Sequence, residues 1–223
     1  MSIKSNGHEH EMEPEYGLPE ALPKGETILW QGSPDFKALA LGAFHFRKLT
    51  VYFGVLLALR ASYLGVSGAV ATDVAFALLW PAVLSLIALA AVATLAWLSA
   101  RTTVYTLTDQ RLVLRIGIVL TLTFNLPLTR IETAGLRLDG AGCGDMPLSL
   151  RGDDRIAWLH LWPHARPWRL TKPEPMLRCV PDAVAVAAKL TDAWGVANQT
   201  PTAFVAQRAQ SSHPTPAWQP VSV

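Results

Sequence analysis

Hydrophobic and polar positions divide the chain into a central apolar block and a later part with a different period. Residues 49–100 contain only two charged side chains, Arg60 and Asp73. The stretch 74–98 has no charge, and as an α-helix it would be about 37 Å long, enough for a hydrocarbon core of about 30 Å. The stretch 49–71 is broken by Arg60 near its middle, but it is still apolar enough to insert. We therefore predict a transmembrane hairpin with helices at about 49–71 and 74–98.

After Arg101 the apolar positions recur at every second residue, which is the period of a β-strand. Residues 183–194 then form an Ala-rich stretch with helical spacing, followed by Gly195 as a stop signal. Strands at this spacing with short turns indicate an antiparallel barrel or sandwich, which the last helix would cap. The predicted strands are 103–108, 111–116, 119–126, 131–138, 148–150, 156–161 and 176–180.

These patterns predict an α+β membrane protein, a two-helix hairpin joined to a cytoplasmic antiparallel barrel. The segment 22–48 has a strand-like start and a Gly/Pro turn, and we expect its strand to dock on the cytoplasmic domain. Both ends of the chain have compositions typical of disorder. The expected divisions are a disordered N-terminus 1–21, a juxtamembrane segment 22–48, the hairpin 49–100, the domain 101–194 and a disordered tail 195–223.

Basic residues flank the two spans, whereas the link between them carries only Asp73. The positive-inside rule then places both termini in the cytoplasm and the link outside, in a multi-pass protein of a bacterial inner membrane. Residues 1–26 are rich in Glu and lack an apolar run, so no signal peptide is expected there. The candidate juxtamembrane anchors are His45, Arg47, Lys48 and Arg101.

Composition excludes several classes of function. Charged residues make up 16% of the chain and the net charge is +2, which leaves no basic excess for nucleic acid. Two cysteines in 223 residues exclude a disulfide-stapled scaffold. The sequence has no Gly-rich phosphate loop and no GxSxG, HExxH or CxxC motif, and neither span contains a His that could bind a pigment metal or haem. We expect a non-enzymatic protein without a metal or another cofactor.

Arg60 lies near the middle of the first span, where a charged side chain is costly. Three interpretations remain open for it. The side chain could extend to one membrane face, bond to carbonyls or hydroxyls of the second helix such as Ser85, or pair with another membrane protein. Small residues on the same span, Gly54 and Ala58, would let a partner helix approach closely. Arg60, Gly54 and Ala58 are therefore the candidate partner contacts in the membrane.

Three segments resemble the bacterial PH-like domain: YTLTDQRLVLRIG at 105–117, LPLTRIE at 126–132 and GETILWQG at 25–32. In that family the domain often follows a transmembrane hairpin. The resemblance implies a seven-stranded, strongly bent antiparallel barrel closed by a C-terminal helix.

A more specific resemblance covers about residues 18–194. LWQGSPD at 29–35, FHFR at 44–47, Arg60 and PEPMLRCVPD at 173–182 are similar to the PuhB-type photosynthetic complex assembly proteins of purple bacteria. The resemblance implies a helper that promotes assembly of the reaction centre and its core light-harvesting complex, with subunits of these complexes as partners. Its candidate interaction surface is Trp30, Pro34, Asp35, Met176, Leu177 and Arg178.

The alternative function is a generic membrane-anchored PH-like module that binds lipid headgroups or an envelope protein complex. Its electrostatics would come from a basic stripe. A homodimer formed through the hairpin is also open. The residues of the stripe are Arg101, Arg111, Arg115, Arg130 and Arg137.

Overall fold

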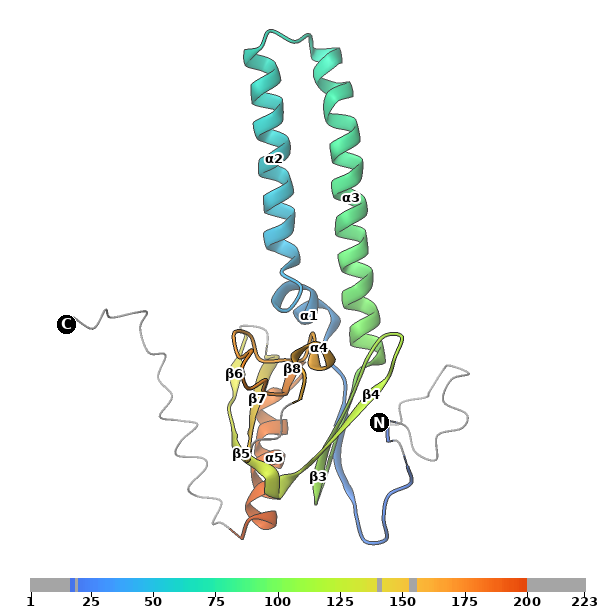
Figure 1. Cartoon of the computed structure of the whole chain (residues 1–223), viewed down its shortest axis with the longest axis vertical. Helices are drawn as coiled ribbons and strands as arrows, with labels where there is room; N and C mark the ends of the chain where they lie inside the picture. Colours follow the sequence, from blue (N-terminus) through green and yellow to red (C-terminus); the bar gives the residue numbers. More distant parts are fainter. Residues whose placement is uncertain (1–16, 19, 140–141, 153–155, 200–223) are drawn as a thin grey trace, which may run out of the picture.

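The structure is a computed structural model that describes residues 17–18, 20–139, 142–152 and 156–199 (Figure 1). Most of the two terminal segments predicted as disordered, 1–21 and 195–223, lies outside these residues. Leu18, within the first of them, is buried.

Two long helices form an arm that extends from the rest of the molecule (Figure 1). Helix α2 is Phe46–Val66 and helix α3 is Ala71–Thr102, and both are long and apolar enough to cross a membrane. Large apolar side chains such as Leu59 and Phe76 point outward along them. The chain therefore does not use these helices as the core of its folded domain.

The first sheet contains four antiparallel strands in the order β1-β2-β3-β4. The strand β1 comes from the segment before the hairpin and pairs with β2, so the predicted docking of that segment is confirmed. The bounds are β1 Ile28–Gly32, β2 Val104–Thr108, β3 Arg111–Ile116 and β4 Leu122–Pro127.

The second sheet is built around β7 (Gly144–Leu150), which pairs with three antiparallel strands. These are β5 Ile131–Ala134, β6 Arg137–Leu138 and β8 Met176–Val180. The last helix, α5 (Ala183–Ala197), contributes Val186 and Leu190 to the core shared with the sheets. It continues past Gly195, where the sequence predicts its end.

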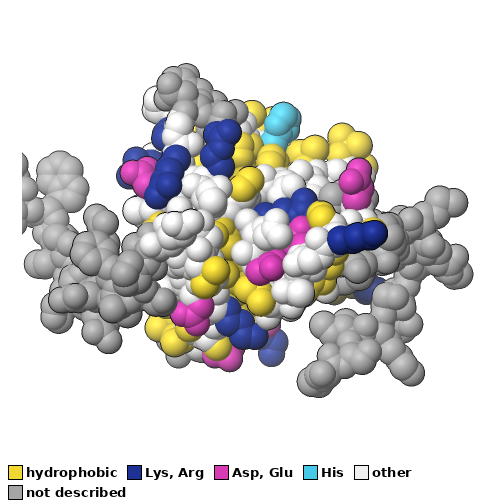
Figure 2. Space-filling view, turned by 90° about the horizontal axis from the view of Figure 1, so that it is seen from below, with side chains coloured by type: hydrophobic (Ala, Val, Ile, Leu, Met, Phe, Trp, Pro, Cys, Tyr) yellow, Lys and Arg dark blue, Asp and Glu magenta, His cyan; other side chains and the backbone are white. Residues whose placement is uncertain are grey.

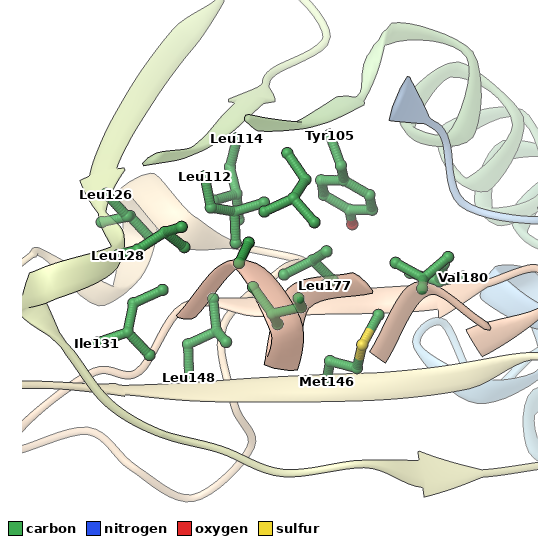
Figure 3. Packing of buried hydrophobic residues seen from close by; sticks show 14 of the residues in the cluster. Tyr105, Leu112, Leu114, Leu126, Leu128, Ile131, Met146, Leu148, Leu177 and Val180 are labelled. Carbon is green, nitrogen blue, oxygen red and sulfur yellow. The ribbon is translucent and has the colours of Figure 1, made fainter. Parts of the chain in front are cut away.

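Apolar side chains from both sheets meet in one core (Figure 3). Leu112 and Leu114 come from the first sheet, and Leu148 and Leu177 from the second. The predicted barrel is wrong, because within the described residues no strand pairing joins β4 to β5 or β1 to β8. Pro127, which offers no amide to a sheet, ends β4, and the 3-10 turn η2 (Leu128–Arg130) separates β4 from β5.

Local structure also differs from the sequence prediction. The predicted strand 156–161 is instead the short helix α4 (Trp158–Leu161), in which Leu161 is buried and Leu159 is exposed. The structure also contains a helix that the pattern did not predict, α1 (Phe36–Gly42). Asp35 begins it by accepting a hydrogen bond from the Ala38 amide at 2.8 Å, as an N-cap does.

Candidate functional site

The polar group in the middle of the hairpin bonds to the neighbouring helix. The Arg60 side chain on α2 donates from Nε to the backbone carbonyl of Ala77 on α3, at 3.3 Å. In a regular helix that carbonyl would accept the amide of residue 81, four positions later. Residue 81 is proline and has no amide hydrogen. Arg60 therefore supplies the donor that Pro81 removes from the α3 backbone.

This contact corresponds to one of the three interpretations of Arg60, a bond to the second helix. The acceptor is Ala77 rather than Ser85, whose hydroxyl instead donates to the Pro81 carbonyl at 2.7 Å. Within the part of the chain that the structure describes, no carboxylate pairs with Arg60. Arg60 is nevertheless one of the exposed residues of α2.

Small residues on α2 lie on the outer side of the hairpin. Gly54 and Ala58 are both exposed. A Cβ added at Gly54, or at Gly65 further along, would meet no atom within 4 Å. These positions are therefore not needed for the packing of α2 against α3. They form a small-residue face, made by Gly54 and Ala58, on which another helix could pack closely.

Beneath the hairpin, α1 and the end of α3 pack on β8. Leu39, Ala100 and Cys179 form a small buried cluster there. The Asp35 amide donates to the Cys179 carbonyl at 2.8 Å, and the Cys179 amide donates to the Asp145 carboxylate at 2.9 Å. We call this region, where α1, α3, β2 and β8 meet, the junction.

A buried hydrogen-bond network lies within the junction. The Tyr105 hydroxyl lies 2.6 Å from His164 Nδ1 and accepts from the Arg178 amide at 3.1 Å. His164 Nε2 lies 3.1 Å from the Thr103 hydroxyl. If Tyr105 donates to Nδ1 and Nε2–H donates to Thr103, every polar hydrogen of the tyrosine and the neutral imidazole has a partner. The network thus ties β2 to β8 and to the segment after α4.

Burial keeps both ring groups of the network uncharged. His164 is fully buried, and the loss of solvation, reinforced by the nearby Arg178 charge, lowers its pKa to about 3. Burial also raises the pKa of Tyr105 far above its ordinary value. At neutral pH the network therefore consists of neutral donors and acceptors, which suits a structural connection.

The candidate interaction surface is largely built into the interior. Met176 and Leu177 are buried in the domain, and Pro34 is also buried. Trp30 is half-buried against the main core. These four side chains are therefore packing residues and not an exposed patch, which corrects the sequence-based prediction.

Two further residues of that predicted surface belong to the junction. Asp35 caps α1, and Arg178 donates from Nη1 to the Pro163 carbonyl at 2.8 Å. The motifs at 29–35 and 173–182 therefore contribute residues to the junction. Sequence reasoning missed Thr103, Tyr105 and His164 as a group, because they are distant along the chain and each follows an ordinary strand or loop pattern.

The predicted juxtamembrane anchors are exposed at the base of the hairpin. His45 has φ 53° and immediately precedes α2, and Arg47 and Lys48 lie in its first turn. At the end of α3, the Arg101 guanidinium lies 5.3 Å from the centre of the Trp97 ring. A stacked Trp and Arg pair is typical of a membrane–water boundary.

The predicted basic stripe is not one surface. Arg101 lies at the end of α3, whereas Arg111 begins β3 at the opposite end of the sheet and pairs with Glu26 at 2.8 Å. Arg130 and Arg137 lie on η2 and β6. On the domain face turned away from the hairpin, basic and acidic side chains are interspersed (Figure 2). Within the described residues, no group of three or more His, Cys, Asp or Glu side chains is placed to hold a metal ion.

Comparison with known proteins adds two findings. A family model described as the bacterial PH domain matches residues 38–194. A relative from Rhodobacter capsulatus, described as an uncharacterized 23.7 kDa protein in the puhA 5′ region, is 40% identical over 207 residues; the match covers 91% of this chain and 95% of the relative. No solved structure matches the chain.

Proposed function

Since the chain belongs to the bacterial PH domain family, we propose that it is a membrane-anchored, non-enzymatic assembly factor for a photosynthetic complex. Its targets would be the reaction centre and its core light-harvesting complex. It would act through protein contacts made in the bilayer and at its cytoplasmic surface.

One observation carries this proposal. The relative that matches nearly the whole chain is described by its place in the puhA 5′ region. The chain also resembles the PuhB-type assembly proteins, whose name has the same puh designation. Because the match covers both hairpin and domain, any shared role would involve the two parts together.

The arrangement of charge and apolar surface supports a hairpin that spans the inner membrane. Large apolar side chains are exposed along most of α2 and α3, while His45, Arg47 and Lys48 lie at the base together with Arg101. The positive-inside rule then favours both termini in the cytoplasm and the link near Gly68 outside. The PH-like domain would lie against the cytoplasmic surface.

In this proposal the outer face of α2 is the contact for a partner helix. The small residues Gly54 and Ala58 on this face permit close approach of a partner helix, whereas Arg60 lies on the side of α2 that bonds to α3. The junction would hold the hairpin and the domain in one orientation, because Leu39 of α1 and Ala100 of α3 pack with Cys179 of β8, whose carbonyl also accepts the Asp35 amide. A partner could then be engaged in the membrane and at the surface at once.

The test is the near-infrared absorption of membranes from a deletion strain grown under pigment-inducing conditions. Loss of the core-complex bands with pigment synthesis intact, and recovery with the wild-type gene, is the expected result. An unchanged spectrum would refute the assembly role and favour the PH-like module that binds lipid headgroups or an envelope complex.

Complementation with variants separates two roles of Arg60. Arg60→Leu removes both the bond to Ala77 and any partner contact, whereas Pro81→Ala returns an amide to the Ala77 carbonyl. If Arg60 serves a partner, Arg60→Leu should reduce the core-complex bands in both backgrounds. If it serves only the hairpin, Arg60→Leu combined with Pro81→Ala should restore them.

A further inference from the structure

The tip of the β3–β4 hairpin exposes apolar side chains that the fold does not use. The last pair of the ladder is Ile116 with Leu122, so residues 117–121 form the tip. Val119 is 90% exposed and Leu120 is 79% exposed. The sequence has no charged side chain between Arg115 and Arg130, so the five residues of the tip are all uncharged.

Strand register directs this tip toward the two-helix arm. Helix α3 ends at Thr102, and β2 begins only two residues later at Val104, which pairs with Arg115 of β3. Because the strands are antiparallel, residues after Arg115 extend past the start of β2, back along the end of α3. Figure 1 shows the hairpin tip level with the last turn of α3. Helix α3 and β3 are also in contact.

The end of α3 has the features of a membrane–water boundary. Trp97 and Arg101 stack there, and the apolar stretch of the helix ends at the same place. Aromatic and basic side chains at the end of an apolar helix lie at headgroup level. A tip level with this turn would therefore lie at the same depth.

The turn has a tight, defined shape. Gly117 has φ 132°, and a Cβ at this position would clash with the carbonyl oxygen of Leu120. Only glycine meets both conditions. The backbone therefore closes sharply beneath Val119 and Leu120, and both side chains remain exposed.

We propose that residues 117–121 enter the headgroup–acyl boundary of the cytoplasmic leaflet, as a third membrane contact beside α2 and α3. The occupant of this apolar tip is the bilayer itself, because the tip is level with the last turn of α3, where the apolar stretch of that helix ends, and β3 contacts α3. The inference rests on the membrane anchoring within the proposed function. It would fix the tilt of the first sheet relative to the membrane plane, since β2 and β4 flank β3 in that sheet.

The experiment measures the depth of a fluorescent label in proteoliposomes of phosphatidylcholine and phosphatidylglycerol. Leu120→Cys carries the label at the tip. Gln110→Cys, exposed at the opposite end of β3, is the matched control, and Leu86→Cys in the middle of α3 reports insertion of the hairpin. All three are made in Cys143→Ser protein. Cys179 is retained because it is buried, and burial, with the nearby Asp145 charge, raises its thiol pKa to about 12, so it reacts slowly.

The expected result is several-fold stronger quenching of the Leu120 label than of the Gln110 label by nitroxide lipids, with the reverse order for aqueous iodide. Equal iodide quenching at the two sites, with Leu86 quenched by lipid, would overturn the inference and leave the anchoring intact. A Leu86 label open to iodide would instead refute the anchoring and the inference with it.

A second copy of the chain is the rival occupant of the tip. Nanodiscs that hold one protein each remove it, so lipid quenching at Leu120 should persist there. Loss of that quenching in the nanodiscs would overturn the bilayer as the occupant.

Discussion

The hairpin and the PH-like domain each contain a polar group that needs a hydrogen-bond partner, and the two parts supply that partner differently. In the hairpin, one long exposed side chain, Arg60, supplies the donor that the Ala77 carbonyl lacks. In the domain, the buried imidazole of His164 is held by the hydroxyls of Thr103 and Tyr105, at the start of β2. The first arrangement is a single exposed bond, and the second is a network enclosed by packing. Loss of the two arrangements should therefore lower the free energy of unfolding by very different amounts.

The largest effect is expected from His164→Ala. The change removes a fully buried ring and leaves the Tyr105 and Thr103 hydroxyls without their hydrogen-bond partner. The free energy of unfolding of the domain should therefore fall by about 4 kcal/mol. Urea unfolding in detergent, followed by tryptophan fluorescence, measures this. His160→Ala, an exposed histidine on α4, is the control and should change stability by less than about 0.5 kcal/mol. Similar values for the two variants would show that the network is not a main connection.

The second effect is a dependence of domain stability on pH. The His164 pKa is lowered from 6.5 to about 3 by burial and by Arg178, so between these values the unfolded chain binds a proton that the folded chain does not. Stability should therefore be full above pH 6.5 and fall on acidification, by about 2 kcal/mol at pH 5. Urea unfolding at pH 7.5 and pH 5 measures the difference.

The same measurement on His164→Gln tests the assignment. Glutamine does not titrate, so the loss between pH 7.5 and pH 5 should shrink by most of those 2 kcal/mol. An unchanged loss in the variant would assign the acid sensitivity to other groups.

A smaller effect is expected from the bond in the hairpin. A double-mutant cycle of Arg60→Leu and Pro81→Ala isolates the pair, because alanine at 81 makes the Arg60 donor redundant. Bonds of this kind in membranes are worth about 0.6 kcal/mol on average, so we expect a coupling of about 0.5–1 kcal/mol between the two substitutions. Reversible unfolding of the full chain in bicelles would measure it. A coupling of zero would mean that Ala77 finds another donor when Arg60 is lost.

The sequence predicts the two regions unequally well, for a physical reason. Absence of charge over 74–98 indicates the apolar arm, since nothing but length and hydropathy is needed. The helix bounds at Phe46 and Thr102 are not visible in that pattern, because the helices continue past the apolar stretch. In the domain, alternation indicates the strands 104–108, 111–116 and 176–180 closely.

Alternation fails in the domain where local pattern and tertiary context disagree. Residues 156–161 alternate but have no partner strand, and four of them form α4. Met176 and Leu177 lie in a distinctive motif, which predicts an interaction surface, yet both side chains are buried in the domain. The link from Tyr105 to His164 joins positions 59 residues apart, and no single-sequence signal relates them.

The last prediction concerns the outer face of the hairpin, where stability and function should separate. Gly54→Leu adds a large side chain where a Cβ meets nothing, so the free energy of unfolding should stay the same or rise by up to about 1 kcal/mol, the gain in helix propensity. The same side chain would project from the small-residue face beside Ala58 and keep a partner helix away. We therefore expect a stable protein that fails to restore the core-complex bands in the deletion strain. Val55→Leu, at an exposed neighbouring position that already bears a large side chain, should restore them fully. If Gly54→Leu instead destabilises the isolated protein, then Gly54 faces α3, and the small-residue face is part of the hairpin's own packing rather than a surface for assembly.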